Sequence, residues 1–292
     1  MTALLTVLAM LAFASNSVLC RLALGQTSID AASFTAVRLL SGALMLTLLV
    51  YFRRRPTPAA GKTTDTEPAL GGNWASALAL FVYAGAFSFA YEKLATGTGA
   101  LLLFGAVQGT MILTGLWSGE RLSGRQMLGL LLAVAGLVVV LLPGLTAPPL
   151  GSALLMLASG VAWGVYSLRG RGVRDPTSAT AGNFLRASVL SVLLGVGLLA
   201  QQNLDGPGLW YAVLSGALAS GVGYAVWYTA LRGLTMTSAA SVQLSVPVLA
   251  ALAGVAFLNE PITLRLALTS VAILGGIALV VLGKKRATAE GR

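Results

Sequence analysis

The side chains best placed to recognise a solute are polar and aromatic residues that interrupt long apolar stretches of the chain. Tyr224 and Tyr228 are four residues apart, which puts both on one face of a helix, and Trp163 follows Ser159 at the same spacing. Aromatic rings can stack on an apolar group, while amides and hydroxyls can bond a polar head. We therefore predict a cavity whose substrate-binding residues are Asn16, Tyr83, Trp163, Tyr224, Tyr228 and Gln243.

Each of these residues also has a structural interpretation. A buried amide without a partner is costly in hydrocarbon, so Asn16 must face protein or a wet cavity. The aromatic residues can instead pack between helices or anchor the chain at the membrane interface. Near Gln243, Pro247 predicts a helix kink, because a proline leaves the carbonyl four residues earlier without its helix partner. That kink either presents Gln243 to a substrate or is purely structural.

Arg38 and Arg186 are the only formally charged residues well inside the apolar stretches of the sequence. Charged side chains at that depth are costly and often mark a substrate pathway. We predict that both are possible contacts for an anionic group such as a carboxylate. The structural alternatives are that these long side chains reach the membrane interface or cap a helix end.

Carboxylates are missing from the middle of the apolar stretches. The acids fall at their edges or in polar segments, namely Asp30, Asp65, Glu67, Glu92, Glu120, Asp175, Asp205, Glu260 and Glu290. A proton-driven exporter of lipophilic cations needs an acid at midplane. We therefore expect a small-molecule substrate that is neutral, zwitterionic or weakly anionic.

The composition excludes several classes of function. With 57% apolar and 10% charged residues, the chain has too little polar surface to cover a water-soluble fold. It contains no His and a single Cys, Cys20, which excludes His-dependent catalysis and Cys-based metal sites. We expect no enzyme activity, no metal and no cofactor. The net charge of +10 indicates membrane topology and not nucleic-acid binding.

Ten apolar stretches have the length needed to carry these side chains across a lipid bilayer. A hydrocarbon core of about 30 Å requires about 20 apolar residues in a helix. Stretches of that size fall at 3–24, 31–52, 74–92, 98–117, 125–142, 150–168, 178–200, 208–231, 236–258 and 263–283. The polar segment 53–72 is interpreted as a flexible loop. The sequence thus predicts an all-α membrane protein with ten transmembrane helices.

The distribution of basic residues predicts the orientation in the membrane. With both termini placed in the cytoplasm, fourteen of the 19 Lys and Arg residues fall on the cytoplasmic side, three outside and two within spans. Short cytoplasmic loops carry such an excess of Lys and Arg. We therefore predict a multi-pass protein of the cell membrane whose two termini are cytoplasmic.

The two halves of the chain share a pattern. At a shift of 140 residues Glu120 aligns with Glu260, and the spacing Glu-x4-Arg recurs between two apolar stretches. Each half has five spans, an odd number, so the halves enter the membrane from opposite sides. This inverted repeat is the plan of many secondary transporters, whose substrate site lies near midplane between the repeats. We predict one membrane unit made of two five-helix repeats, 1–145 and 146–292.

Several motifs resemble the EamA-type members of the drug/metabolite transporter superfamily. They are Tyr228-Thr-Ala-Leu-Arg232, Ser238-Ala-Ala, Pro247 and Leu258-Asn-Glu260-Pro in the second half, and Gly119-Glu120-Arg-Leu-Ser123 and Ala36-Val-Arg38 in the first. The resemblance covers the whole chain and is closest to the YddG-type amino-acid exporters. It implies an exporter of small metabolites in the bacterial cytoplasmic membrane, with a cavity lined by the first, third, fourth, sixth, eighth and ninth spans.

Together these features predict a secondary transporter that exports small metabolites, amino acids or their analogues, by alternating access through a central cavity. A nucleotide-sugar or sugar-phosphate antiporter is the alternative within transport. A non-transporting membrane scaffold is the alternative from another class. The sequence does not distinguish proton coupling from facilitated diffusion or exchange, and it sets no oligomeric state.

Overall fold

The apolar stretches fold into helices throughout the computed structural model, which describes residues 1–53, 70–119, 121–144, 147–198, 202–234 and 236–289. The helices are α1 (Thr2–Gln26), α2 (Ala31–Arg53), α3 (Trp74–Tyr91), α4 (Thr96–Trp117), α5 (Gly124–Leu141), α6 (Leu150–Arg169), α7 (Pro176–Gly197), α8 (Gly206–Val213), the π-helix η2 (Leu214–Val222), α9 (Gly223–Leu231), α10 (Met236–Gln243), α11 (Ser245–Leu258) and α12 (Leu264–Ala289). Within the described residues, ten helical stretches are long and apolar enough to cross a membrane. The predicted all-α membrane fold with ten transmembrane helices is confirmed.

Some predicted features lie outside the described residues. These are most of the loop 53–72 and the acids Asp65, Glu67, Glu120 and Glu290.

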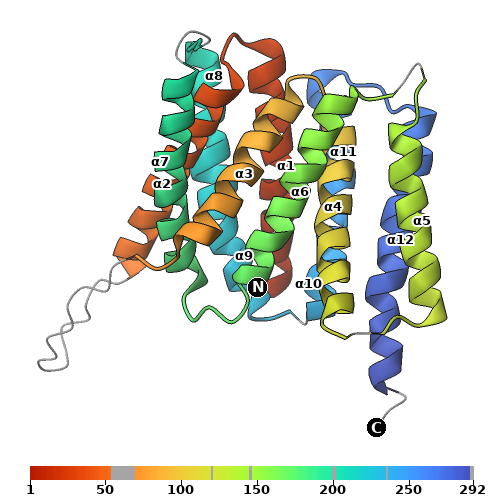
Figure 1. Ribbon diagram of the computed structural model, residues 1–292. Coiled ribbons are helices and arrows are strands. Elements are labelled where there is room, and N and C mark those ends of the chain that lie inside the picture. The colour runs from red at the N-terminus through yellow and green to blue at the C-terminus, as the bar shows by residue number, and fades with distance from the viewer. Residues whose placement is uncertain (54–69, 120, 145–146, 199–201, 235, 290–292) are drawn as a thin grey trace, which may run out of the picture.

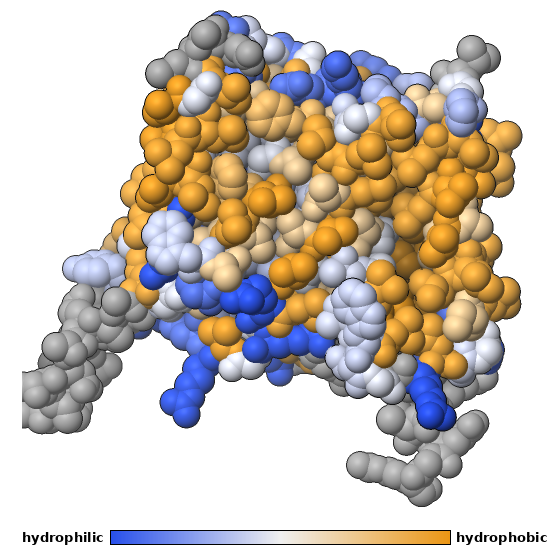
Figure 2. Space-filling view, in the orientation of Figure 1, coloured by the Kyte–Doolittle hydropathy of each residue, from blue (hydrophilic) through white to orange (hydrophobic). Residues whose placement is uncertain are grey.

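The surface has the polarity that a bilayer requires. An apolar belt covers the middle of the bundle on the face drawn in Figure 2, and polar residues gather at its two ends. Large apolar side chains such as Leu44, Leu193 and Val271 are exposed, which is expected where lipid and not water covers the surface. The two chain ends lie at the same end of the bundle (Figure 1), as an even number of spans dictates.

Helices of the two predicted halves pack against one another rather than forming separate bodies. The pair α2 and α7, the pair α3 and α6, and the pair α5 and α12 all join a helix of the first half to one of the second. In the same way, α1 packs on α9 and α11, and α4 packs on α6 and α11. Figure 1 shows α5 and α12 as a pair at one edge of the bundle. A space between the halves is therefore walled by both of them.

The eighth span differs from the continuous α-helix that the sequence predicts. Its middle section, η2, winds as a π-helix between α8 and α9. Gly216 lets η2 approach α2 closely, because a Cβ atom at this glycine would stand 2.1 Å from the carbonyl oxygen of Arg38. π-Helical turns within α-helices are frequent at functional sites, and this one carries Ser220, which lines the cavity described below.

The ninth span is broken at Leu244, between α10 and α11. The interruption thus lies three residues before Pro247, where the sequence places the kink. Because Pro247 has no N–H to donate to the carbonyl of Gln243, α10 ends at that residue and a new helix begins. Pro247 then lies in the first turn of α11, a position where proline is tolerated.

Short polar side chains begin several helices at both ends of the bundle. Asn73 accepts a hydrogen bond from the backbone N–H of Ser76 at 2.9 Å, which caps the first turn of α3. Asp30 caps α2 in the same way through the N–H of Ser33 at 2.9 Å. Burial alone would raise the pKa of the Asp30 carboxyl, but hydrogen bonds from Ser33, Asn203 and Ala32 outweigh it and lower that pKa below its ordinary value.

Candidate functional site

A cavity of about 840 Å³ lies between the two predicted halves. Its walls come from α1, α3, α4, α6, α7, η2, α9 and α10, and the start of α5 and the later part of α12 also contribute. Exposed residues of the connection between α6 and α7, at 170–173, belong to its rim. That connection is at the end of the bundle that holds both chain termini (Figure 1), so the cavity opens at this end.

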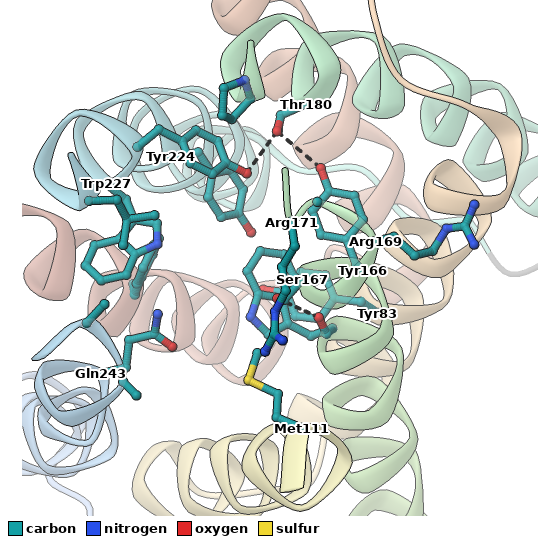
Figure 3. Close-up of a pocket in the computed structure, with 18 of the residues that line it drawn as sticks. Tyr83, Met111, Tyr166, Ser167, Arg169, Arg171, Thr180, Tyr224, Trp227 and Gln243 are labelled. Atoms are coloured by element: carbon teal, nitrogen blue, oxygen red, sulfur yellow. Dashed lines mark hydrogen bonds between the residues drawn. The ribbon is translucent and has the colours of Figure 1, made fainter. Parts of the chain in front are cut away.

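All the side chains predicted to bind substrate line this one cavity, although they come from five helices. They are Asn16 on α1, Tyr83 on α3, Trp163 on α6, Tyr224 and Tyr228 on α9, and Gln243 on α10. Figure 3 shows Trp227 and Gln243 across the cavity from Tyr83 and Tyr166. The structure therefore brings the six predicted residues together, and their role in binding stays a prediction.

Asn16 does not meet lipid, because its amide is bonded on both sides. Its Nδ2 donates to the Tyr83 hydroxyl at 3.4 Å, and its Oδ1 accepts from the Ser215 hydroxyl at 2.5 Å. Asn16 is 6% exposed, and Ser215 is fully buried in η2. Both polar atoms of the buried Asn16 amide therefore have a hydrogen-bond partner, as buried polar groups usually do. These bonds also join α1, α3 and the π-helical section of the eighth span.

Trp163 is the centre of an aromatic wall. Its ring lies 5.3 Å from those of both Tyr166 and Tyr224 in stacked arrangements, and 4.8 Å from the ring of Tyr83 in a tilted one. Tyr228 continues the wall, with its ring 6.3 Å from that of Tyr224. Such rings offer flat apolar surface, and their π faces also attract an ammonium group.

Sequence reasoning missed a second set of polar residues in the cavity wall. Thr180 Oγ1 lies 3.0 Å from the Tyr228 hydroxyl and 3.2 Å from the Tyr166 hydroxyl, and Asn183 Nδ2 donates to Tyr166 at 3.4 Å. Figure 3 shows the bond between Thr180 and Tyr166. Tyr166 follows Trp163 by three residues, which is a signal for the same helix face. Thr180 and Asn183 lie on a helix without such an aromatic pattern.

The described lining of the cavity contains cations and no acid. Arg169 and Arg171 line it beside the rim, where Arg169 is held by Ser76 Oγ at 3.1 Å and Asn73 Oδ1 at 3.2 Å. A concave surface with this charge attracts anionic groups. Among the residues that the structure describes, no cluster of His, Cys, Asp or Glu could hold a metal ion.

The two arginines predicted as possible anion contacts differ in their surroundings. Arg186 is half-buried, and its Nη1 donates to the backbone carbonyls of Gly71 at 3.1 Å and Gly182 at 2.9 Å. Arg38 is 1% exposed and its Nη2 donates to the Tyr83 hydroxyl at 2.9 Å. Neither guanidinium lines the cavity, but Arg38 is bonded to a residue that does.

At the opposite end of the bundle, a polar cluster joins the two halves. Arg21 Nε pairs with Glu260 Oε1 at 3.4 Å, and Arg21 Nη1 donates to the carbonyls of Tyr91 and Glu92 at 3.0 Å each. Glu260 Oε2 accepts from the backbone N–H of Thr96 at 2.7 Å, at the start of α4. Arg21 and Glu260 border a separate hollow of about 390 Å³ at this end. The large cavity does not reach them, so it is closed on this side.

The backbone around Glu260 explains how its side chain reaches the first half. Asn259 ends α11 in the left-handed conformation, with φ of 53°, which asparagine tolerates better than most residues. The N–H of Glu260 then bonds back to the carbonyl of Gly254 at 3.2 Å. A negative carboxylate at the N-terminus of α4 also complements the positive end of the helix dipole.

Two of the comparisons with known proteins name a transporter. The sequence model of the EamA-like transporter family matches residues 1–142 and again residues 150–282. An uncharacterized protein of Pseudomonas aeruginosa is 61% identical over 99% of this chain and 98% of its own. An uncharacterized transporter of Archaeoglobus fulgidus is 28% identical over 59% of this chain and 62% of its own. A crystal structure at 22% identity covers 98% of both chains with a TM-score of 0.67, which indicates a shared fold.

Proposed function

This chain belongs to the EamA-like transporter family, and from that premise we propose that it exports small metabolites, with amino acids or their analogues as substrates. One observation carries the proposal. The cavity of about 840 Å³ is walled by both halves and opens at one end of the bundle, while Arg21 and Glu260 join the halves at the other. A site between two halves that is open to one side at a time is what alternating access requires.

The charge distribution supports an orientation in which the open end of the cavity faces the cytoplasm. The open end of the cavity is the end that holds both termini (Figure 1), and the excess of Lys and Arg supports a cytoplasmic location for that end. A substrate would therefore enter from the cytoplasm and leave after the Arg21–Glu260 end has opened. This loading from inside supports an exporter of the cytoplasmic membrane.

The lining suits a zwitterion with an apolar side chain better than a lipophilic cation. Its described residues include no acid, while Arg169 and Arg171 lie beside the rim. An ammonium group can bind to the faces of Trp163, Tyr224 and Tyr228 by cation–π attraction without a carboxylate. These features support the amino-acid export of the YddG-type members, which the sequence motifs resemble.

A counterflow assay tests this function. Purified protein is reconstituted in liposomes loaded with unlabelled solute, and entry of labelled amino acids, cationic dyes and nucleotide sugars is measured with and without a pH gradient. We expect accumulation of apolar amino acids above that in empty liposomes. Accumulation of quaternary ammonium dyes with no amino-acid flux would contradict the proposal, and absence of flux for every solute would favour a scaffold.

A phosphate-bearing substrate is the second candidate because of the two cations near the rim. Arg169 and Arg171 line the cavity, and a nucleotide sugar could enter past them. The deep part of the cavity is aromatic, however, and phosphate recognition usually relies on several convergent cations or backbone N–H groups. The same counterflow assay separates the two, since an antiporter of this kind would exchange nucleotide sugars and not amino acids.

A further inference from the structure

Arg38 is a buried cation whose charge is not matched by a carboxylate in the described part of the chain. The ion pairs there are Arg21 with Glu260 and Arg53 with Asp175. Arg38 is instead packed against two rings, with its guanidinium carbon 4.8 Å from the centre of Phe87 and 5.2 Å from that of Tyr83. Its Nε and Nη1 are buried without a hydrogen-bond partner among the described residues. Such a charge is costly unless something compensates it.

Among the described residues, the Arg38 guanidinium has one hydrogen-bond partner, and that partner lines the cavity. Arg38 Nη2 donates to the Tyr83 hydroxyl at 2.9 Å, and Asn16 Nδ2 donates to the same oxygen at 3.4 Å. Both partners are pure donors, so the Tyr83 oxygen is the acceptor in both bonds. Its own O–H is left to donate, and Tyr83 lines the cavity. A hydroxyl that accepts from a cation is itself a stronger donor.

We propose that the Tyr83 hydroxyl, polarised by the buried Arg38, binds the carboxylate of the substrate at the inner end of the cavity. Arg38 acts through Tyr83 as a positioning residue, and its positive field selects an anionic group over a neutral one. The substrate class is then a carboxylic acid with an apolar or aromatic body, which packs on the Trp163 wall. This inference rests on the proposed function for the cavity but concerns the chemical group that the cavity recognises.

The arrangement also explains why the other arginine within a span does not take this role. The Arg186 guanidinium donates hydrogen bonds to the backbone carbonyls of Gly71 and Gly182. Its bonds to described residues share no partner with those of Asn16, Tyr83 and Arg38. Arg186 therefore offers a matched control, since its loss also removes a cation from within a span.

The test compares a carboxylate with its neutral amide in binding to the purified protein. The probes are L-phenylalanine against L-phenylalaninamide, and 3-phenylpropionate against 3-phenylpropionamide, which lacks the amine. Binding is read from the rise in unfolding temperature with ligand concentration, because a ligand that binds only the folded state stabilises it. In the native protein we expect each acid to bind at least about tenfold more tightly than its amide, a difference of about 1.4 kcal/mol.

Variants then test which residues cause the preference for the acid over its amide. Arg38→Gln and Tyr83→Phe should each reduce the acid-to-amide ratio to about one, Arg38→Lys should restore part of it, and Arg186→Gln should keep the native ratio whatever its overall stability. Folding of each variant is checked by size-exclusion chromatography. If Arg38→Gln fails to fold, Tyr83→Phe and the native comparison still decide.

Each outcome counts for or against the proposal. Equal binding of acid and amide by the native protein overturns it, even if counterflow shows transport, and so does a folded Arg38→Gln protein with the native ratio. Failure of all four probes to bind overturns it as well. Acid-selective binding that depends on Arg38 and Tyr83 but is accompanied by no flux in liposomes would leave this inference standing and overturn the proposed transport.

Discussion

The two ends of the bundle differ in how the halves meet, and this difference is the basis of the proposed mechanism. At the end of both chain termini, a cavity opens between the halves, and its rim includes the exposed residues 170–173. The halves are also joined at this end, since Arg53 of α2 pairs with Asp175 at the start of α7. At the opposite end, Arg21 of α1 reaches Glu260, and Glu260 reaches the N-terminus of α4. This charged cluster joins the two halves beyond the closed end of the cavity.

The largest effect is expected from breaking the closed end. Glu260→Ala leaves Arg21 without its acid and removes the acceptor of the Thr96 N–H. Losing a charged hydrogen-bond partner costs about 1.5–3 kcal/mol, so we expect counterflow to fall about tenfold or more. Glu260→Gln should be intermediate, because its amide oxygen can still accept from Thr96.

The matched control at this end is Arg265→Gln. Arg265 is a cation that bonds the backbone carbonyl of Leu142 and has no recorded bond to Glu260. Its replacement should change transport by less than about twofold. Equal losses in Glu260→Ala and Arg265→Gln would mean that general charge at this end, and not the Arg21–Glu260 pair, maintains the closure.

The next effect concerns the aromatic wall of the cavity. Trp163→Ala removes ring contacts to Tyr83, Tyr166 and Tyr224. In the proposed site the substrate also loses Trp163 as the surface on which it packs. An aromatic pair contributes about 0.5–1.5 kcal/mol beyond burial, so substrate affinity in counterflow should fall about tenfold with folded protein retained. Trp210→Ala, on the exposed surface of α8, should transport like the native protein. Similar losses in both variants would assign the effect to membrane anchoring.

A smaller effect is expected at the break in the ninth span. Gln243→Ala removes one amide from the cavity lining and leaves the α10–α11 break, because the proline is untouched. One hydrogen bond contributes about 0.5–1.5 kcal/mol, so apparent substrate affinity should fall about threefold to tenfold. Gln202→Ala is the control, since Gln202 bonds the carbonyl of Gly195 outside the cavity. Native affinity in Gln243→Ala would remove that residue from the binding set.

The smallest effect is expected from Tyr228→Phe. The change deletes the hydroxyl that is 3.0 Å from Thr180 Oγ1 and keeps the ring that continues the aromatic wall. Thr180 retains the Tyr166 hydroxyl as a partner. We expect a loss of about 0.5–1 kcal/mol in unfolding free energy and less than about threefold in transport. A transport loss as large as that of Trp163→Ala would show that the hydroxyl, and not the ring, contacts the substrate.

Most of the fold could be predicted from the sequence, because the length and apolar composition of each span are local properties. The predicted stretch 31–52, for example, became α2 at Ala31–Arg53. Helical spacing also marked Trp163, Tyr224 and Tyr228 as residues that share helix faces, and these faces do line one cavity. The helix boundaries and faces could therefore be predicted from single segments.

The remaining features depend on contacts between distant segments. Arg21 and Glu260 are 239 residues apart, and no local pattern links them. The π-helical turn of η2 arises where Gly216 packs against the backbone of α2, which a sequence read one span at a time does not reveal. The break at Leu244, three residues ahead of Pro247, likewise reflects where the chain resumes a helix after a missing hydrogen bond. Arg38 could be identified as a buried charge, but its bond to Tyr83 could not.

Accessibility of a single cysteine from each side of the membrane tests the central claim most directly. In a Cys20→Ala background, which removes the one native thiol, Ala240→Cys places a thiol in the cavity lining on α10. A small, membrane-impermeant thiosulfonate is added from either side, and a C-terminal tag identifies the side of the termini. We predict faster reaction from the side of the termini than from the opposite side, and a higher reaction rate from the opposite side after Glu260→Ala. Equal reaction from both sides in the protein with Glu260 intact would contradict the account.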